Sequence, residues 1–113
     1  MTRPRWPAPW VRAALDLAVL ATLDGGPRHG YAIAQALAGR GFGLLKGGSL
    51  YPALNRLEEL GDVEAQWVEG HGGPGRKAYA LTEQGRDRLA RDLAAWRELG
   101  ETMTTMTTQE HPG

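Results

Sequence analysis

Residues 49–60 read SLYPALNRLEEL and carry the pattern that decides the fold. Apolar side chains recur at three- and four-residue spacing, which predicts a helix with one buried face: Leu50, Ala53, Leu54, Leu57 and Leu60. Ser49 is a typical N-cap residue. Pro52 lacks the N–H that later helical turns use, so it fits only the first turn. We therefore predict a helix that begins close to Ser49 and ends before Gly61, a typical C-terminal glycine.

The face of this helix opposite the apolar stripe carries side chains suited to contacting DNA: Ser49, Tyr51, Pro52, Asn55 and Arg56. An arginine can donate two hydrogen bonds to guanine, and an asparagine can pair with adenine. Serine and tyrosine hydroxyls can donate to phosphate. The alternative is a solvated helix face on which Tyr51 packs partly against the core and Ser49 is only a cap.

Two further helices are predicted upstream. Residues 10–23 are rich in alanine, leucine and valine, which predicts a largely buried helix. A second helix is predicted over residues 30–38, and the glycine-rich residues 39–48 are predicted to be a linker. The apolar face of the second helix is Tyr31, Ala34 and Leu37.

Residues 1–9 hold three prolines and are predicted to be a flexible, extended arm. Arg3, Arg5 and Trp6 in this arm would either contact a DNA backbone or a partner subunit, or belong to a disordered tail.

Downstream of the deciding helix, residues 63–69 and 76–81 alternate in hydropathy and predict a β-hairpin with a glycine-rich tip over residues 70–75. Glycines allow a phosphate chain to approach the backbone closely, and cations beside them supply salt-sensitive affinity. We predict phosphate contacts for Arg76 and Lys77 and leave His71 open. An ordinary turn with solvated charges is the alternative.

Thr82 is predicted to cap a long final helix over residues 83–106, followed by a disordered tail over residues 107–113. Apolar residues recur at near-heptad spacing along this helix as far as Met106. The order of elements is helix, helix, helix, hairpin, helix. It predicts a mainly α fold with a β-hairpin wing, in which a winged helix-turn-helix domain over residues 10–82 precedes a C-terminal dimerisation helix.

The composition narrows the function. The chain of 113 residues has no cysteine, which excludes disulfides and thiolate metal sites. Its net charge is zero, but residues 1–57 hold seven basic and two acidic side chains, whereas residues 58–113 hold six basic and eleven acidic ones. A basic half can dock on a polyanion even in a neutral protein.

Neither a nucleophile–base pair nor a metal-ligand cluster stands out in the sequence, so we expect no enzyme, no cofactor and no metal site. The glycines at 70, 72 and 75 match a dinucleotide-binding motif, but a strand follows them where that motif requires a helix. The longest apolar run is too short to span a membrane and no secretory leader is recognisable, so a cytoplasmic protein is expected.

Three segments, in this order and spacing, closely resemble the PadR family of transcriptional regulators: GPRHGY at 26–31, GSLYPALNRLE at 48–58 and GGPGRKAYALTEQGR at 72–86. The resemblance covers roughly residues 15–96. The single short C-terminal helix is similar to the small subgroup of the family, which includes multidrug-responsive members.

The resemblance implies a homodimeric repressor that binds a two-fold-symmetric operator in double-stranded DNA. It also implies that five of the apolar residues on the final helix form the dimer interface: Leu89, Leu93, Trp96, Leu99 and Met103. Targets in the family commonly concern drug efflux or phenolic-acid detoxification. In the small members, a tryptophan at the place of Trp96 stacks on planar aromatic effectors, which implies a ligand pocket formed with Leu93 and Leu17. The alternatives are that Trp96 only anchors the dimer, and that the chain is a winged-helix protein-interaction module without DNA binding.

Overall fold

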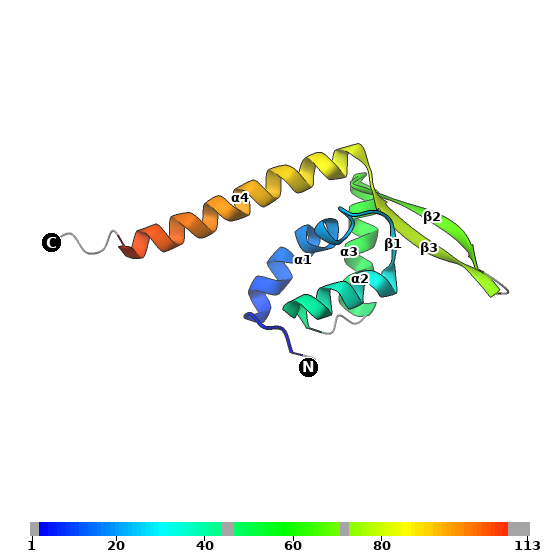
Figure 1. Cartoon of the computed structure of the whole chain (residues 1–113), viewed down its shortest axis with the longest axis horizontal. Coiled ribbons are helices and arrows are strands. Elements are labelled where there is room, and N and C mark those ends of the chain that lie inside the picture. Colours follow the sequence, from blue (N-terminus) through cyan, green and yellow to red (C-terminus); the bar gives the residue numbers. More distant parts are fainter. Residues whose placement is uncertain (1–2, 44–46, 71–72, 109–113) are drawn as a thin grey trace.

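The computed structural model describes residues 3–43, 47–70 and 73–108 (Figure 1). Its elements are α1 (Ala8–Thr22), β1 (Arg28–His29), α2 (Gly30–Leu37) with a π-helical turn (Ala38–Phe42), α3 (Gly47–Leu60), β2 (Val63–Gly70), β3 (Gly73–Leu81) and α4 (Glu83–Thr108). This order confirms the predicted mainly α fold with a β-hairpin wing.

The first three helices and the base of the sheet enclose one apolar core. α3 contributes the stripe expected from its sequence, since Leu50, Ala53, Leu54 and Leu57 are all buried. Three predictions of burial are wrong. α1 was expected to be largely buried, but only one of its faces is. Leu60 is exposed at the end of α3, and Tyr31 is exposed because α2 buries a different face: Gly30, Ile33 and Leu37.

The sheet has three antiparallel strands in the order β1-β3-β2, where the sequence predicts two. β1 is only two residues long, and Arg28 and His29 pair with Tyr79 and Ala78 of β3. Such a short strand shows no alternating pattern, which is why the sequence does not reveal it. β2 forms an edge of the sheet, and the hairpin projects past α3 as a wing (Figure 1).

The N-terminal segment packs against the protein, which differs from the flexible arm expected for residues 1–9. α1 begins at Ala8, and the backbone N–H of Arg5 donates to the carbonyl of Gly41 at 2.7 Å. The ring of Trp6 meets Phe42 edge-on at 5.6 Å between centroids. Gly41 has a φ of 102°, which side chains rarely adopt, and an added Cβ would lie 3.1 Å from the Cβ of Arg5 and 3.3 Å from the ring of Trp6, so glycine suits this close approach.

α3 begins two residues earlier than predicted, at Gly47, so Pro52 lies inside the helix. The predicted linker is also shorter, because the π-helical turn Ala38–Phe42 extends α2. Residues 44–46 lie outside the described part of the chain.

Thr82 caps α4 as predicted. The backbone N–H of Gly85 donates to its hydroxyl oxygen at 3.0 Å, and the hydroxyl itself donates to the carbonyl of Gly61 at 2.6 Å. α4 first crosses α1 and then projects away from the domain on the side opposite the wing, which gives the molecule a length of 70 Å (Figure 1). Among the described helices, none combines the length and the apolar character needed to cross a membrane.

Candidate nucleic-acid interface and ligand pocket

The outward face of α3 carries the predicted DNA-contacting residues. All of them are exposed, while the opposite face of the helix is buried in the core: Ser49, Tyr51, Pro52, Asn55 and Arg56. Tyr51 is both partly packed and partly exposed, so it fits the DNA-contact interpretation and the packing interpretation alike. Its ring packs so closely on Gly30 of α2 that a Cβ there would lie 2.6 Å from the Tyr51 hydroxyl, yet the side chain stays 44% exposed.

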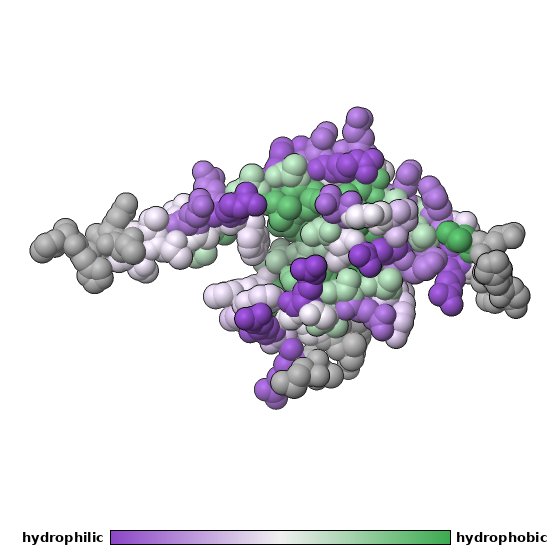
Figure 2. Space-filling view, viewed as in Figure 1, coloured by the Kyte–Doolittle hydropathy of each residue, from purple (hydrophilic) through white to green (hydrophobic). Residues whose placement is uncertain are grey.

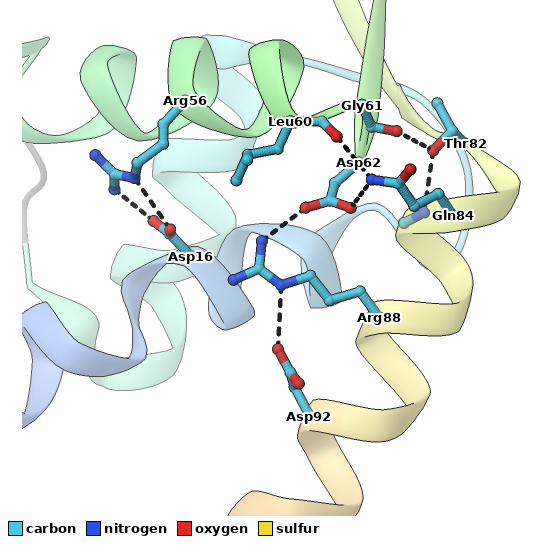
Figure 3. Close-up of polar contacts among 10 residues, drawn as sticks. Asp16, Arg56, Leu60, Gly61, Asp62, Thr82, Gln84, Arg88 and Asp92 are labelled. Atoms are coloured by element: carbon cyan, nitrogen blue, oxygen red, sulfur yellow. Dashed lines mark hydrogen bonds and ion pairs between the residues drawn. The ribbon is translucent and has the colours of Figure 1, made fainter.

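Arg56 points sideways from α3 toward α1 (Figure 3). Its Nε and Nη2 donate to the two carboxylate oxygens of Asp16 at 3.1 and 2.6 Å. This hydrogen bonding, together with the negative charge of Asp16, raises the pKa of Arg56 above its usual value. Because a guanidinium has five N–H donors, Arg56 retains donors on the side turned away from Asp16. The sequence did not indicate this pairing, since 40 positions separate the two residues.

The wing places one of its two described cations, Lys77, beside α3. Lys77 Nζ lies 3.6 Å from a carboxylate oxygen of Glu58 on α3 and 5.5 Å from the ring centroid of Tyr79. Arg76 is exposed. His71 lies outside the described residues.

Two exposed aromatic residues near these elements were missed from the sequence. Tyr31 at the start of α2 is 71% exposed, and its hydroxyl accepts a hydrogen bond from Gln35 at 3.0 Å. Trp67 on β2 is 74% exposed. Tyr31 lies in the apolar periodicity of a helix, which suggested packing in the core. Trp67 lies in an alternating strand segment, which gave no sign of a separate role.

The predicted dimer interface on α4 forms a continuous apolar stripe whose outer part is exposed. Its members from residue 93 onward are 40–55% exposed: Leu93, Trp96, Leu99, Met103 and Met106. Leu89 is different. It is 5% exposed and packs in the core of its own chain, which leaves it little surface for a second copy.

The three predicted ligand residues line one pocket. Its volume is about 530 Å³, and it lies where α4 crosses α1 and the end of α2, with Leu17, Leu93 and Trp96 in its wall. Figure 2 shows hydrophobic atoms gathered at this crossing. Arg28, Arg40 and Asp24 add charge to the lining. This size falls within the usual range for small-molecule sites.

Trp96 also borders a second hollow of about 360 Å³. The remaining wall of this hollow comes from the N-terminal segment, α1 and the π-helical turn: Trp6, Trp10, Val11, Ala14 and Phe42. Trp96 therefore contributes to the walls of both hollows within one chain.

A buried polar network joins α4 to the turn between α3 and β2 (Figure 3). Asp62 is 3% exposed, and its carboxylate accepts from Arg88 at 2.6 Å and from the Gln84 amide at 2.8 Å. Arg88 Nε also donates to Asp92 at 3.1 Å. Burial alone would raise the pKa of Asp62, but the hydrogen bonds from Gln84 and Arg88 outweigh it, so the pKa is lowered.

Comparison with known proteins agrees with this geometry. The model of the transcriptional regulator PadR-like family matches residues 19–91. A PadR family transcriptional regulator from Eggerthella lenta is 30% identical, and its structure superimposes with a TM-score of 0.78 over 88% of this chain and 86% of that one. An uncharacterized protein from Lysinibacillus sphaericus is 30% identical over 93 residues, which cover 80% of this chain and 85% of the relative.

Bacillus subtilis PadR, solved in complex with operator DNA, is 28% identical. The two structures superimpose with a TM-score of 0.62 over 70% of this chain and 46% of that one. The family match spans the winged-helix region from α1 into α4. The chain belongs to the PadR-like family of transcriptional regulators.

Proposed function

We propose that the protein is a repressor that binds a two-fold-symmetric operator in double-stranded DNA as a homodimer and responds to a planar aromatic small molecule. The observation that carries the proposal is the division of α3 into a buried face and an outward face with exposed Asn55 and Arg56 beside a cationic wing. A helix of this kind fits the major groove of B-DNA while the wing flanks it. The similar PadR from Bacillus subtilis was solved with operator DNA, which supports the same partner here.

Asn55 and Arg56 have different parts in the proposed recognition. Asn55 is exposed near the middle of α3, where its amide can pair with an adenine. Arg56 is held by Asp16, so it would contact a guanine or a phosphate through the donors that Asp16 does not occupy. Asp16 then acts as a positioning residue, because it limits the orientations of the guanidinium before DNA arrives.

Replacing Asn55 or Arg56 by alanine is expected to weaken binding to the operator by about 1–3 kcal/mol each and to relax base preference at the contacted position. The measurement is a titration of operator DNA and of operator variants, after footprinting on the DNA upstream of the gene has located the site. Lys77→Ala is the contrasting variant, since losing a phosphate contact should weaken all sequences alike and reduce the salt dependence.

Urea unfolding of each variant separates a loss of stability from a loss of recognition, which matters for Arg56→Ala because it also breaks the pair with Asp16. Operator binding that is unchanged in both the Asn55 and the Arg56 variants would remove α3 as the reading element. A wild-type protein that retards no DNA at low salt would instead favour a winged-helix module for protein interaction.

The homodimer is proposed from the exposed apolar stripe of α4, which a second copy would cover. The stripe is continuous with the wall of the 530 Å³ pocket through Leu93 and Trp96. A ligand that packs against Trp96 would therefore lie beside the dimer contact and could change the spacing of the two α3 helices. Release from DNA follows only if the ligand favours the arrangement that does not bind.

Trp96→Ala is expected to abolish the quenching of tryptophan fluorescence by planar aromatic compounds, because the removed indole is the stacking surface of the pocket. The measurement is a fluorescence titration, in which Trp10→Ala is the matched control because Trp10 lines only the neighbouring hollow. Saturable quenching that persists in the Trp96 variant would place the ligand elsewhere.

A further inference from the structure

The wing carries a tryptophan that packs against no part of the core. Trp67 on β2 is the most exposed large apolar side chain in the described part of the molecule, at 74%. β2 is an edge strand, and Trp67 lies toward the distal end of the hairpin, beyond the residues that anchor the wing to the core. Single exposed apolar side chains are common on protein surfaces, so the case for a partner depends on where Trp67 lies and on what surrounds it.

The register of the hairpin determines which way Trp67 faces. Trp67 lies directly opposite Lys77 on β3, and residues opposite one another in an antiparallel pair project from the same face. Lys77 reaches Glu58 of α3 at 3.6 Å. The face that carries Trp67 and Lys77 is therefore the one turned toward α3, and it borders the angle between the wing and α3 (Figure 1).

The chemistry of this face matches a nucleic-acid backbone. The cationic ammonium of Lys77 lies directly across the hairpin from the flat apolar indole, and the carboxylate of Glu58, 3.6 Å away, offsets part of its charge until a phosphate takes its place. Deoxyribose offers an apolar ring surface, and the phosphates on either side of it offer negative charge. An added Cβ at Gly75 would lie 3.5 Å from Cε3 of Trp67, so the glycine leaves this part of the indole uncovered.

We propose that Trp67 is a DNA-contact residue whose indole packs on the deoxyribose surface of the backbone ridge that lies between α3 and the wing. When α3 occupies a major groove and the wing reaches the next minor groove, this ridge lies in the angle that Trp67 borders. The proposal rests on the proposed DNA-binding function. It adds an apolar contact, which differs from the cationic contacts in its response to salt.

Salt dependence separates the two kinds of contact. A phosphate contact releases counterions, so its loss reduces the slope of log Kd against log salt. An apolar contact releases none. Trp67→Ala is therefore expected to weaken operator binding about tenfold at every salt concentration while the slope stays that of the wild type. Trp67→Phe should recover most of the loss, because it restores an aromatic surface.

The experiment measures operator binding between 50 and 200 mM salt, about the range over which cationic contacts change affinity strongly. Val68→Ala is the matched control: Val68 is the next residue of β2, is also exposed and apolar, but projects from the other face. Its affinity should equal that of the wild type. Circular dichroism and light scattering establish that all three variants keep the fold and the oligomeric state of the wild type.

Four results would overturn the assignment. Three concern binding: wild-type affinity in Trp67→Ala, an equal loss in Val68→Ala, or a reduced salt slope in Trp67→Ala. The fourth is dissociation of an oligomer in Trp67→Ala, because the indole would then pack on a second copy. A wild-type protein that binds no DNA refutes the proposed function itself, and that result is read from the wild type before any variant is compared.

Discussion

Replacing Leu99 by aspartate is expected to convert the proposed dimer into a monomer and to weaken operator binding more than about 100-fold. Leu99 is half exposed in the middle of the apolar stripe of α4. In a symmetric interface the substitution places two carboxylates in the contact, and each loses hydration without gaining a partner. A monomer presents one α3 to the operator and loses the second set of contacts. Light scattering measures the mass, and a titration with operator DNA measures the affinity.

The control for this variant is Ala94→Asp, which introduces the same charge at an exposed position of α4 away from the apolar stripe. The fold should survive in both variants, since neither residue belongs to the core. Circular dichroism checks this. A Leu99→Asp protein that keeps the mass of the wild type would show that the stripe is covered in some other way, and the proposed dimer would have to use another face.

The fold was predictable because its strongest signals are local. The leucine spacing of residues 49–60, the alternation on both sides of the glycine-rich hairpin tip and the cap at Thr82 each act within a few residues. Each of them predicted an element that the structure contains. The ends of the elements were predicted less accurately than the elements themselves. At α3 the sequence argument placed Pro52 in the first turn, whereas the helix starts at Gly47 and accommodates the proline inside.

The features that the sequence did not reveal depend on residues far apart in the chain. The pair between Asp16 and Arg56 joins α1 to α3, and the contact of Trp6 with Phe42 joins the N-terminal segment to the π-helical turn. The composition of the N-terminal segment predicted a free arm, because its prolines remove backbone hydrogen-bond donors. The prolines do not prevent the aromatic rings of the segment from packing against the protein. β1 is defined by its pairing with β3 and has no pattern of its own.

In the candidate site, too, the sequence predicted the features that depend on local spacing and missed those that depend on contacts between distant residues. Exposure of the outward face of α3 follows from helical periodicity, so those residues could be named from sequence. The pocket beside Trp96 was expected from the resemblance to the small PadR members, and the structure brings Leu17 and Leu93 to it from two different helices. Which donors of Arg56 are available, and which way Trp67 faces, required the packing of α1 and the register of the hairpin.

The buried network at the base of α4 leads to a prediction about stability and its pH dependence. Arg88→Met is expected to lower the free energy of unfolding by about 2–3 kcal/mol at pH 7, because it leaves the carboxylate of Asp62 buried with only the Gln84 amide as a side-chain partner. Urea unfolding measures the effect. Asp92→Ala is the control: it removes the exposed partner of the same arginine, and a surface pair contributes little.

The sign of the pH effect follows from the pKa of Asp62. In the wild type this pKa is lowered, so the pairing stabilises the fold above the unfolded value of about 4 and is lost as the pH falls through the folded pKa. In Arg88→Met only the Gln84 hydrogen bond and the charge of Arg91 still oppose the effect of burial, so the pKa of Asp62 should be higher than in the wild type and the variant should lose less stability as the pH falls. The difference in stability between the two proteins should therefore be largest at pH 7 and shrink toward about pH 3.

Adding Asp62→Asn to Arg88→Met should restore part of the stability at pH 7, since the buried charge is then gone. A constant difference across this pH range, or a double variant no more stable than Arg88→Met, would show that Arg88 stabilises α4 by packing alone.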